Sequence, residues 1–368
     1  MTLSWLSVDA RTGGVLADLP DLDCPKVSRS ICRYDSTTAT LPVPTAPEGW
    51  ELATRPGGAV MILLSDDLPI WGGMVTQRTR GSGDSIPLAL ATTEAYFDRR
   101  FVGNETYVGV GQNAIVADLV TKYVATGPLG GIPIRVVQVG GAGTLRDRTY
   151  TDESDKTVYS CLTELAGVDG GPQWAVEWEH QSSPERYTPV LYVGSRIGAA
   201  VMAGMAPTAT FDIPGCVTDV TYVEDYSGSG RAANVVTAST TGDGTTRLVS
   251  PVQVAADDGR PSYQWRFTPT TSITEVDTLT SHAVRMLATI APGSIAIALS
   301  AAVDAAPKLG AEWVLGDDVG FIIGGLDSQG ADTVPAFRGG LSGVARCFGW
   351  ELTLGNTQIV TPILVQGA

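Results

Sequence analysis

Apolar residues in this chain gather in short runs that have the length of a β-strand and end at turn residues. Residues 59–64 form one such run, and a turn at Asp66-Asp67 leads to a second run at 70–75, which predicts a β-hairpin. Similar runs recur about every ten residues through 1–98, as in a small barrel or sandwich. The 43 glycines and 22 prolines suit the many turns that such a fold needs.

Three segments change to the 3.6-residue period of an α-helix. In residues 112–125 the apolar side chains form one stripe, and Gly127-Pro128 follows as a stop signal. A second helix is predicted over 155–166, with Ser154 as its N-cap, and a third over 275–290. The chain is therefore expected to have a β-rich α+β fold.

The chain is acidic, with a formal net charge of −15 and a pI of about 4.5. Nucleic-acid binding depends on a positively charged surface that neutralises phosphates. No cluster of Lys and Arg is present in the sequence, so we expect no specific nucleic-acid binding. Dense basic runs for an anionic lipid surface are also missing. Acidic walls would still let DNA pass, because like charges do not adhere.

The cysteines are widely spaced and odd in number, and no Cys-x-x-Cys pair occurs, which argues against a zinc site. We expect them to be small buried apolar side chains of a protein made in a reducing cytosol. The N-terminus has no signal-peptide pattern, and no apolar run approaches the roughly 18 residues of a membrane helix. The five cysteines are Cys24, Cys32, Cys161, Cys216 and Cys347.

Only two histidines occur, His180 and His282, and neither has a second candidate ligand at metal spacing. A Ser-His-Asp triad or a Cys-His pair would have to use one of them, and no Gly-x-Ser-x-Gly turn presents a serine. We expect both to be surface or helix-face residues. Gly109 and Gly111 precede a helix as in a dinucleotide fingerprint, but Ala114 stands at the third glycine position and no Walker loop occurs.

Paired carboxylates would be needed for glycoside or peptidoglycan hydrolysis. Glu177 and Glu179 share one face of a predicted strand, in which Trp174, Val176 and Trp178 alternate with them, and a solvated strand face is the favoured interpretation. The other pairs lie mostly in turns, where Asp bonds to the local backbone, and no EF-hand spacing for calcium occurs. These pairs are Asp66-Asp67, Glu224-Asp225, Asp257-Asp258 and Asp317-Asp318.

The eight tryptophans are scattered along the chain. A sugar platform would need exposed rings in one place, so packing in a core or an interface is favoured. We therefore predict no catalytic, cofactor-binding or metal-ligating residues, and we expect that the chain is not an enzyme.

Five stretches that encode packing and turns follow one another along most of the chain. The first places Trp71-Gly72-Gly73 in a strand, and the last joins Trp313 to Gly316-Asp317-Asp318. In their order and spacing the chain resembles the minor tail and hub proteins of actinobacterial siphophages, which are similar in turn to the baseplate hub of contractile-tailed phages. The stretches are residues 68–75, 94–102, 157–165 with 170–177, 233–236 with 259–261 and 279–287, and 313–319.

The resemblance implies a tail-hub-like fold of two small β-barrel-like domains with α+β insertions. We place the first barrel in 1–98 plus 208–250, interrupted at 99–207 by an α+β insertion that stands apart from it. Residues 251–294 are expected to form a helix-containing connecting domain, and residues 295–368 the second barrel.

The resemblance further implies a structural virion protein at the distal tail tip, assembled in the host cytoplasm. It would be a hub subunit that closes the tail tube and docks tail-tip or fibre proteins. A homotrimer with two barrels per chain would form a pseudo-six-fold ring. The tail tube or distal tail protein, the tape measure protein and other minor tail proteins are the implied partners.

Two alternatives remain open: a carbohydrate-binding tail-tip protein that recognises the host receptor, and a peptidoglycan hydrolase. Larger members of the family continue into fibre or hydrolase domains. Because this chain stops at Ala368, we expect such an activity to come from a partner.

Overall fold

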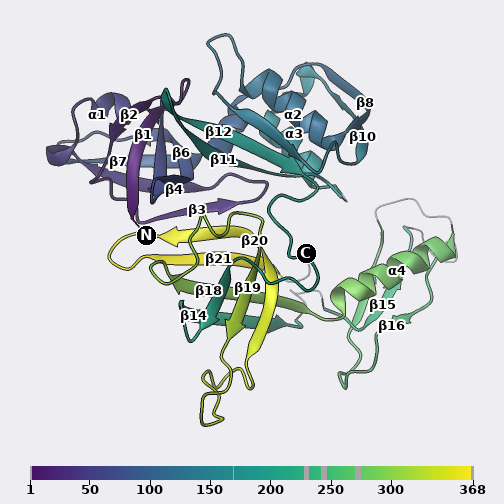
Figure 1. Ribbon diagram of the computed structural model, residues 1–368. Coiled ribbons are helices and arrows are strands. Elements are labelled where there is room, and N and C mark those ends of the chain that lie inside the picture. The colour runs from purple at the N-terminus through teal and green to yellow at the C-terminus, as the bar shows by residue number, and fades with distance from the viewer. Residues whose placement is uncertain (1, 169, 228–231, 242–246, 270–274, 366–368) are drawn as a thin grey trace. The chain divides into compact units, whose positions relative to one another are not determined.

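The computed structural model describes residues 2–168, 170–227, 232–241, 247–269 and 275–365. The chain divides into two compact units, and Figure 1 labels most of their helices and strands. Unit 1 comprises Met1–Val220 and Ala298–Ala368, and unit 2 comprises Thr221–Ile297. Strands outnumber helices throughout the described residues, which confirms the predicted β-rich α+β class.

The N-terminal part of unit 1 is an antiparallel six-stranded sheet in the order β2-β1-β5-β6-β7-β4. The predicted hairpin is confirmed, because β5 and β6 are joined by Asp66 and Asp67. Both aspartates have positive φ, 45° and 68°, as a two-residue type I′ turn requires. The strands are β1 (Leu3–Asp9), β2 (Val15–Asp18), β4 (Ser36–Pro42), β5 (Ala59–Ser65), β6 (Leu68–Arg78) and β7 (Ser85–Thr92), and the short helices beside them are η1 (Val43–Thr45), α1 (Trp50–Ala53) and η2 (Thr93–Arg99).

An α+β segment follows this sheet in unit 1. The helix predicted over 112–125 is confirmed as α2 (Gln112–Leu119), which continues into a π-helical turn, η3 (Val120–Val124). The strands β8 and β10 pair with each other, while β11 pairs with β12 and β12 runs parallel to β9. The remaining elements are β8 (Glu105–Gly111), β9 (Arg135–Val139), β10 (Leu145–Tyr150), η4 (Asp152–Ser154), α3 (Val158–Ala166), β11 (Gln173–Ser182) and β12 (Glu185–Gly194).

Helix α3 confirms the second predicted helix but begins three residues later than expected. Its N-cap is Thr157, whose Oγ1 accepts a hydrogen bond from Ser160 N at 3.1 Å. Ser154 instead ends the turn η4, and the following Asp155 has a positive φ of 48°, which interrupts a right-handed helix. The prediction of Ser154 as the cap is therefore wrong.

The prediction that this insertion stands apart from the first sheet is also wrong. Trp178 of β11 and Tyr187 of β12 are buried in one cluster with Leu6, Val8 and Ile62 of the first sheet. Trp178 shares one face of β11 with Trp174 and Val176, and β11 contacts β6 of the first sheet, so part of this apolar face is covered there. The insertion and the first sheet therefore share a core.

The C-terminal part of unit 1 contains a seven-stranded sheet in the order β13-β19-β20-β21-β18-β14, in which β3 also pairs with β20. We expected strands after residue 208 to pair with 1–98, but β13 runs parallel to β19 instead. A period of two in the apolar residues predicts that a segment is a strand, but it does not predict with which other strand the segment pairs. The proposed domain boundaries stay a prediction. The strands are β3 (Lys26–Ser30), β13 (Thr210–Ile213), β14 (Val217–Asp225), β18 (Ser294–Ala302), β19 (Asp318–Ile323), β20 (Leu341–Thr353) and β21 (Ile359–Val365).

Unit 2 has a three-stranded sheet in the order β16-β15-β17, with β15 (Val235–Ala238), β16 (Gln253–Val254) and β17 (Gln264–Phe267). The third predicted helix is confirmed as α4 (Val276–Ile290), which packs on β15 (Figure 1). Leu279 and Ala283 of α4 are fully buried with two residues of β15.

The predicted loops at 225–230 and 240–245 lie partly outside the described residues. The strand expected at 247–249 amounts to one bridge, between Ser239 and Val249. Among the described residues, no helix is long and apolar enough to cross a membrane.

Candidate functional site

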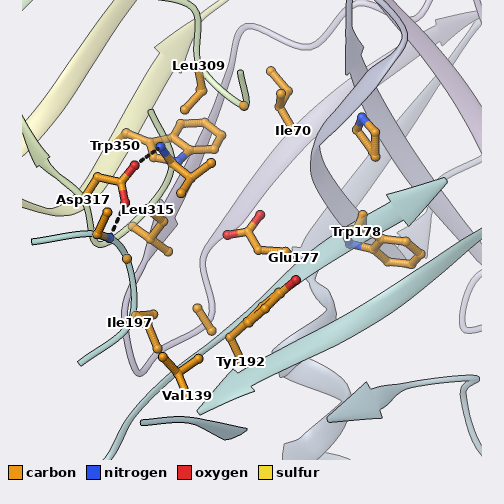
Figure 2. Close-up of a pocket in the computed structure, with 16 residues that line it drawn as sticks. Ile70, Val139, Glu177, Trp178, Tyr192, Ile197, Leu309, Leu315, Asp317 and Trp350 are labelled. Carbon is orange, nitrogen blue, oxygen red and sulfur yellow. Dashed lines mark hydrogen bonds between the residues drawn. The ribbon is translucent and has the colours of Figure 1, made fainter. Parts of the chain in front are cut away.

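A cavity of about 470 Å³ lies inside unit 1, where β6, β11, β12 and β20 meet the loops that precede β13 and β19. Its walls are mostly apolar and include Ile70, Trp178, Tyr192 and Trp350. Figure 2 shows the carboxylate of Glu177 directed into this space. The volume is within the range of small-molecule sites, about 300–1,000 Å³, so the cavity is the candidate site of the chain.

Glu177 belongs to a charge cluster with Arg29 of β3 and Glu94 of η2. Arg29 Nη1 donates to Glu177 Oε2 at 3.0 Å, and Arg29 Nη2 lies 3.7 Å from Glu94 Oε1. The side chains of Arg29 and Glu94 are 3% and 2% exposed, whereas that of Glu177 is 30% exposed. Glu94 Oε1 accepts a further hydrogen bond from Val176 N at 3.0 Å, so the backbone holds Glu94 in place.

The surroundings shift the ionisation of this cluster. Burial raises the pKa of Glu177, the charge of Arg29 opposes the rise, and the carboxylate of Glu94 adds to it. Burial alone would lower the pKa of Arg29, but the carboxylates of Glu177 and Glu94 outweigh burial and raise this pKa. Arg29 therefore stays charged, and Glu177 ionises less readily than an exposed glutamate.

The predicted acid pair Asp317-Asp318 lies at the cavity wall and holds loops together. Asp317 Oδ1 accepts from Ala199 N at 2.6 Å, and Oδ2 accepts from Val314 N at 2.9 Å, as the dashed lines in Figure 2 mark. Asp318 pairs with Arg196 at 2.5 Å. Burial would raise the pKa of Asp318, but the hydrogen bonds from Arg196 and from Val201 N and the charge of Arg196 together outweigh burial and lower this pKa. Both carboxylates thus serve local structure.

The structure does not bring Glu177 and Glu179 together as a catalytic pair. Glu179 binds Arg135 at 2.5 Å, while Glu177 binds Arg29. Four of the six other predicted acids accept backbone N–H groups, three of them from a residue two positions ahead, as expected for Asp in turns. Bonds of this kind join Asp66 to Thr2, Asp225 to Ser227, Asp257 to Gly259 and Asp258 to Arg260. Within the described ranges, no group of three His, Cys, Asp or Glu residues is placed to hold a metal ion.

The two histidines lie on different elements, β11 and α4. His180 of β11 stacks on Tyr187 with ring centroids 4.7 Å apart, and its Nε2 lies 3.7 Å from Glu185. His282 is half-buried on α4. Gly111 is the N-cap of α2, and a Cβ there would lie 2.4 Å from Ala142 O, so a close chain approach accounts for this glycine.

The predicted packing of the tryptophans is confirmed. Trp174 and Trp178 are 0% and 7% exposed, and six of the eight tryptophans are buried. The cysteines are free, four of them are buried, and Cys32 is half-buried. Burial raises the pKa of Cys24, Cys32 and Cys161 to about 11 and that of Cys347 to about 12.

Sequence reasoning missed the buried charges Arg29, Glu94 and Arg346. Arg346 is 4% exposed and donates to Gly316 O at 3.1 Å and to Ile197 O at 2.8 Å, so it ties a cavity loop to β20. One signal was present: Arg29 is two positions from both Val27 and Ile31, so the three side chains share one face of a strand.

No family model and no curated protein sequence matches the chain. Solved structures do match it. A tail protein from Neisseria meningitidis MC58 covers 100% of this chain and 98% of its own, with 15% identity and a TM-score of 0.58. The 43 kDa tail protein of prophage MuSo2 from Shewanella oneidensis covers 98% of both chains, with 11% identity and a TM-score of 0.56.

A chain of the lidded PdpA–VgrG complex from Francisella covers 98% of this chain and 52% of its own, with 7% identity and a TM-score of 0.54. At these identities the likeness concerns the fold. The chain therefore has the β-rich, tail-hub-like α+β fold that the resemblance implied.

Proposed function

We propose that this chain is a structural subunit of a phage tail, the hub that closes the distal end of a siphophage tail tube and docks tail-tip or fibre proteins. The observation that carries the proposal is the fold match, which runs over nearly the full length of two tail proteins and of this chain. A fold hosts more than one function, so the chemistry of the chain has to agree with the proposal.

The chemistry agrees with a structural role. Glu177 and Glu179 are each paired with an arginine, and Asp317 is bonded to two backbone N–H groups. None of these carboxylates is arranged as the acid and base of a glycosidase. The net charge of −15 also suits a protein along which DNA slides without adhering.

Assembly as a homotrimer at the distal tail tip, after synthesis in the host cytoplasm, is part of the proposal. The six-stranded and the seven-stranded sheets would supply two docking modules per chain, so three chains would offer six contacts to a six-fold tube. The neighbours would be the tail tube or distal tail protein, the tape measure protein and other minor tail or fibre proteins.

Cryo-electron microscopy of the particle whose genome encodes the chain tests this proposal. We expect three copies at the distal end of the tail, with the two sheets of each copy in similar positions around the axis. Six copies in one ring, or a location outside the tail, would contradict it. Specific binding on a glycan array would support the carbohydrate-binding alternative, and release of muropeptides from cell wall would support the hydrolase.

A further inference from the structure

The cavity in unit 1 differs from an ordinary packing defect because the carboxylate of Glu177 faces it. One oxygen of this carboxylate accepts no hydrogen bond from the described residues. Arg29 donates to Glu177 Oε2, and among the described residues none donates to Glu177 Oε1. Figure 2 shows this carboxylate inside the ring of labelled side chains. Asp317, the other acid of the wall, has both oxygens bonded to backbone N–H groups. Glu177 Oε1 is therefore an acidic oxygen of the cavity that is able to accept from a ligand.

The charge balance around Glu177 favours a positive partner. The charged groups that face it are Arg29 of β3, Glu94 of η2 and Asp317 of the loop before β19. Glu177 therefore shares Arg29 with Glu94, while Asp317 accepts from two backbone N–H groups and the nearby Arg346 donates to the carbonyls of Gly316 and Ile197. A buried carboxylate without a full counter-charge is costly, and a cation beside it would remove that cost.

The rest of the wall suits the apolar part of such a cation. Tyr192 and Trp350 of the wall are aromatic, and aromatic rings attract ammonium and guanidinium groups. Ile70, Ile197, Leu309 and Leu315 complete an apolar lining that would take a short alkyl chain.

We propose that this cavity is a binding site for an organic cation, an ammonium group on a short alkyl chain, with Glu177 Oε1 as its acceptor. A free amine and the lysine side chain of a partner protein share this chemistry. The inference stands on the cavity alone and does not depend on the proposed tail function.

Titration calorimetry with three probes tests the site: n-pentylammonium, 1-pentanol as the uncharged control of equal length, and the blocked tripeptide acetyl-Gly-Lys-Gly-amide. We expect n-pentylammonium to bind at least tenfold more tightly than 1-pentanol. If the tripeptide also binds, the site takes a lysine side chain of a partner; if only the amine binds, it takes a free amine. Equal affinity for the amine and the alcohol, or no binding of either cation, would overturn the proposal.

Two variants with a matched control locate the binding. Glu177→Gln keeps the shape of the side chain and should weaken n-pentylammonium binding at least tenfold. Glu179→Gln changes an exposed acid two residues along the same strand, outside the lining of the cavity, and should leave binding unchanged. Should Glu177→Gln not fold, Ala199→Trp fills the exposed cavity mouth and should abolish binding. Unchanged binding in Ala199→Trp would show that the cation binds elsewhere.

Discussion

The indole of Trp178 on β11 lies directly against the backbone of Gly72 on β6. A Cβ built at Gly72 would be 2.1 Å from Trp178 Nε1, closer than any Cβ contact in a real protein. The next residue, Gly73, stands in the same relation to Trp71, whose ring carbon Cη2 would be 2.2 Å from its Cβ. The glycine pair of β6 thus makes room for two buried tryptophans, one on each side of the strand.

Replacing Gly72 by alanine should destabilise unit 1. The new methyl group would have to displace an indole that is 7% exposed, and overpacking of this kind costs about 1–3 kcal/mol in the free energy of unfolding. Gly81 is the control, because a Cβ there meets nothing within 4 Å, and Gly81→Ala should change this free energy by less than about 0.5 kcal/mol. Urea unfolding followed by tryptophan fluorescence measures both; equal stability of the two variants would refute the packing argument.

Replacing Arg29 by methionine should be more damaging still. The change leaves the carboxylates of Glu94 and Glu177 without their common partner, and breaking a buried ion pair costs about 3–5 kcal/mol. Lys26→Met on the same strand is the control, since its pair with Glu351 is exposed and worth about 1 kcal/mol or less. Chemical denaturation of both variants at neutral pH measures these changes in the free energy of unfolding. A loss of less than 1 kcal/mol in Arg29→Met would contradict the prediction.

The raised pKa of Glu177 gives the stability a defined dependence on pH. Folding raises the pKa of this carboxyl above its value in the unfolded chain, which is about 4.3. Its contribution to stability is complete below pH of about 4.3, where the carboxyl is protonated in both states. The contribution is lost as the pH rises through the pKa of the folded state. The free energy of unfolding of the native protein relative to Glu177→Gln should therefore fall over a range of pH that begins near about 4.3 and extends upward. Urea titrations across this range measure the gap, with Glu179→Gln as the control. If the difference in free energy of unfolding between the native protein and Glu177→Gln stays constant, or increases with pH, the prediction is contradicted.

The thiols should react slowly in the folded protein. Cys32 is the sharpest case, because it is half-buried, so access alone does not protect it, and burial raises its pKa to about 11. At pH 8 an ordinary cysteine with a pKa near 8.5 is about one quarter thiolate, and a thiol with a pKa of about 11 is roughly 0.1% thiolate. Alkylation of Cys32 by iodoacetamide should therefore be at least tenfold slower in native than in urea-unfolded protein, as followed by mass spectrometry. Equal rates would show that Cys32 is not desolvated.

Local features of this fold were predictable because neighbouring residues encode them. The stripe that contains Ile115 and Leu119 predicted α2, and the turn at Asp66-Asp67 predicted the first hairpin. The pairing of β3 with β20 was not predictable, since Ser30 and Gly349 are more than three hundred positions apart and no local pattern links them. Strand periodicity says which residues face a core and leaves the identity of the neighbouring strand open.

The candidate site was less accessible to sequence reasoning than the fold. Glu177 was singled out as one of a pair with Glu179, but its partner proved to be Arg29, which the tertiary structure brings to it from 148 positions away. The cavity itself is assembled from strands and loops between Pro69 and Trp350, so its existence depends on the whole of unit 1.

The last prediction concerns the independence of the two units. The buried cluster of unit 2 lies within residues 236–283, and removing 226–292 takes no residue from the clusters of unit 1 that contain Ile115 and Leu6. The cut ends are close, since a Cβ at Gly293 would lie 2.9 Å from Asp225 O, and two glycines should bridge them at little entropic cost. We expect this deletion variant to unfold cooperatively, with a melting temperature within a few degrees of the parent protein.

Deleting 99–205 with the same linker is the contrasting control. It removes Trp178 and Tyr187 from the cluster that they form with Leu6, Val8 and Ile62, so the first sheet should lose its fold. Near-ultraviolet circular dichroism and thermal melting distinguish the outcomes, because seven of the eight tryptophans remain after the first deletion. If the 226–292 deletion melts without cooperativity, or if the 99–205 deletion keeps a native melt, then the cores are not divided as the buried clusters indicate.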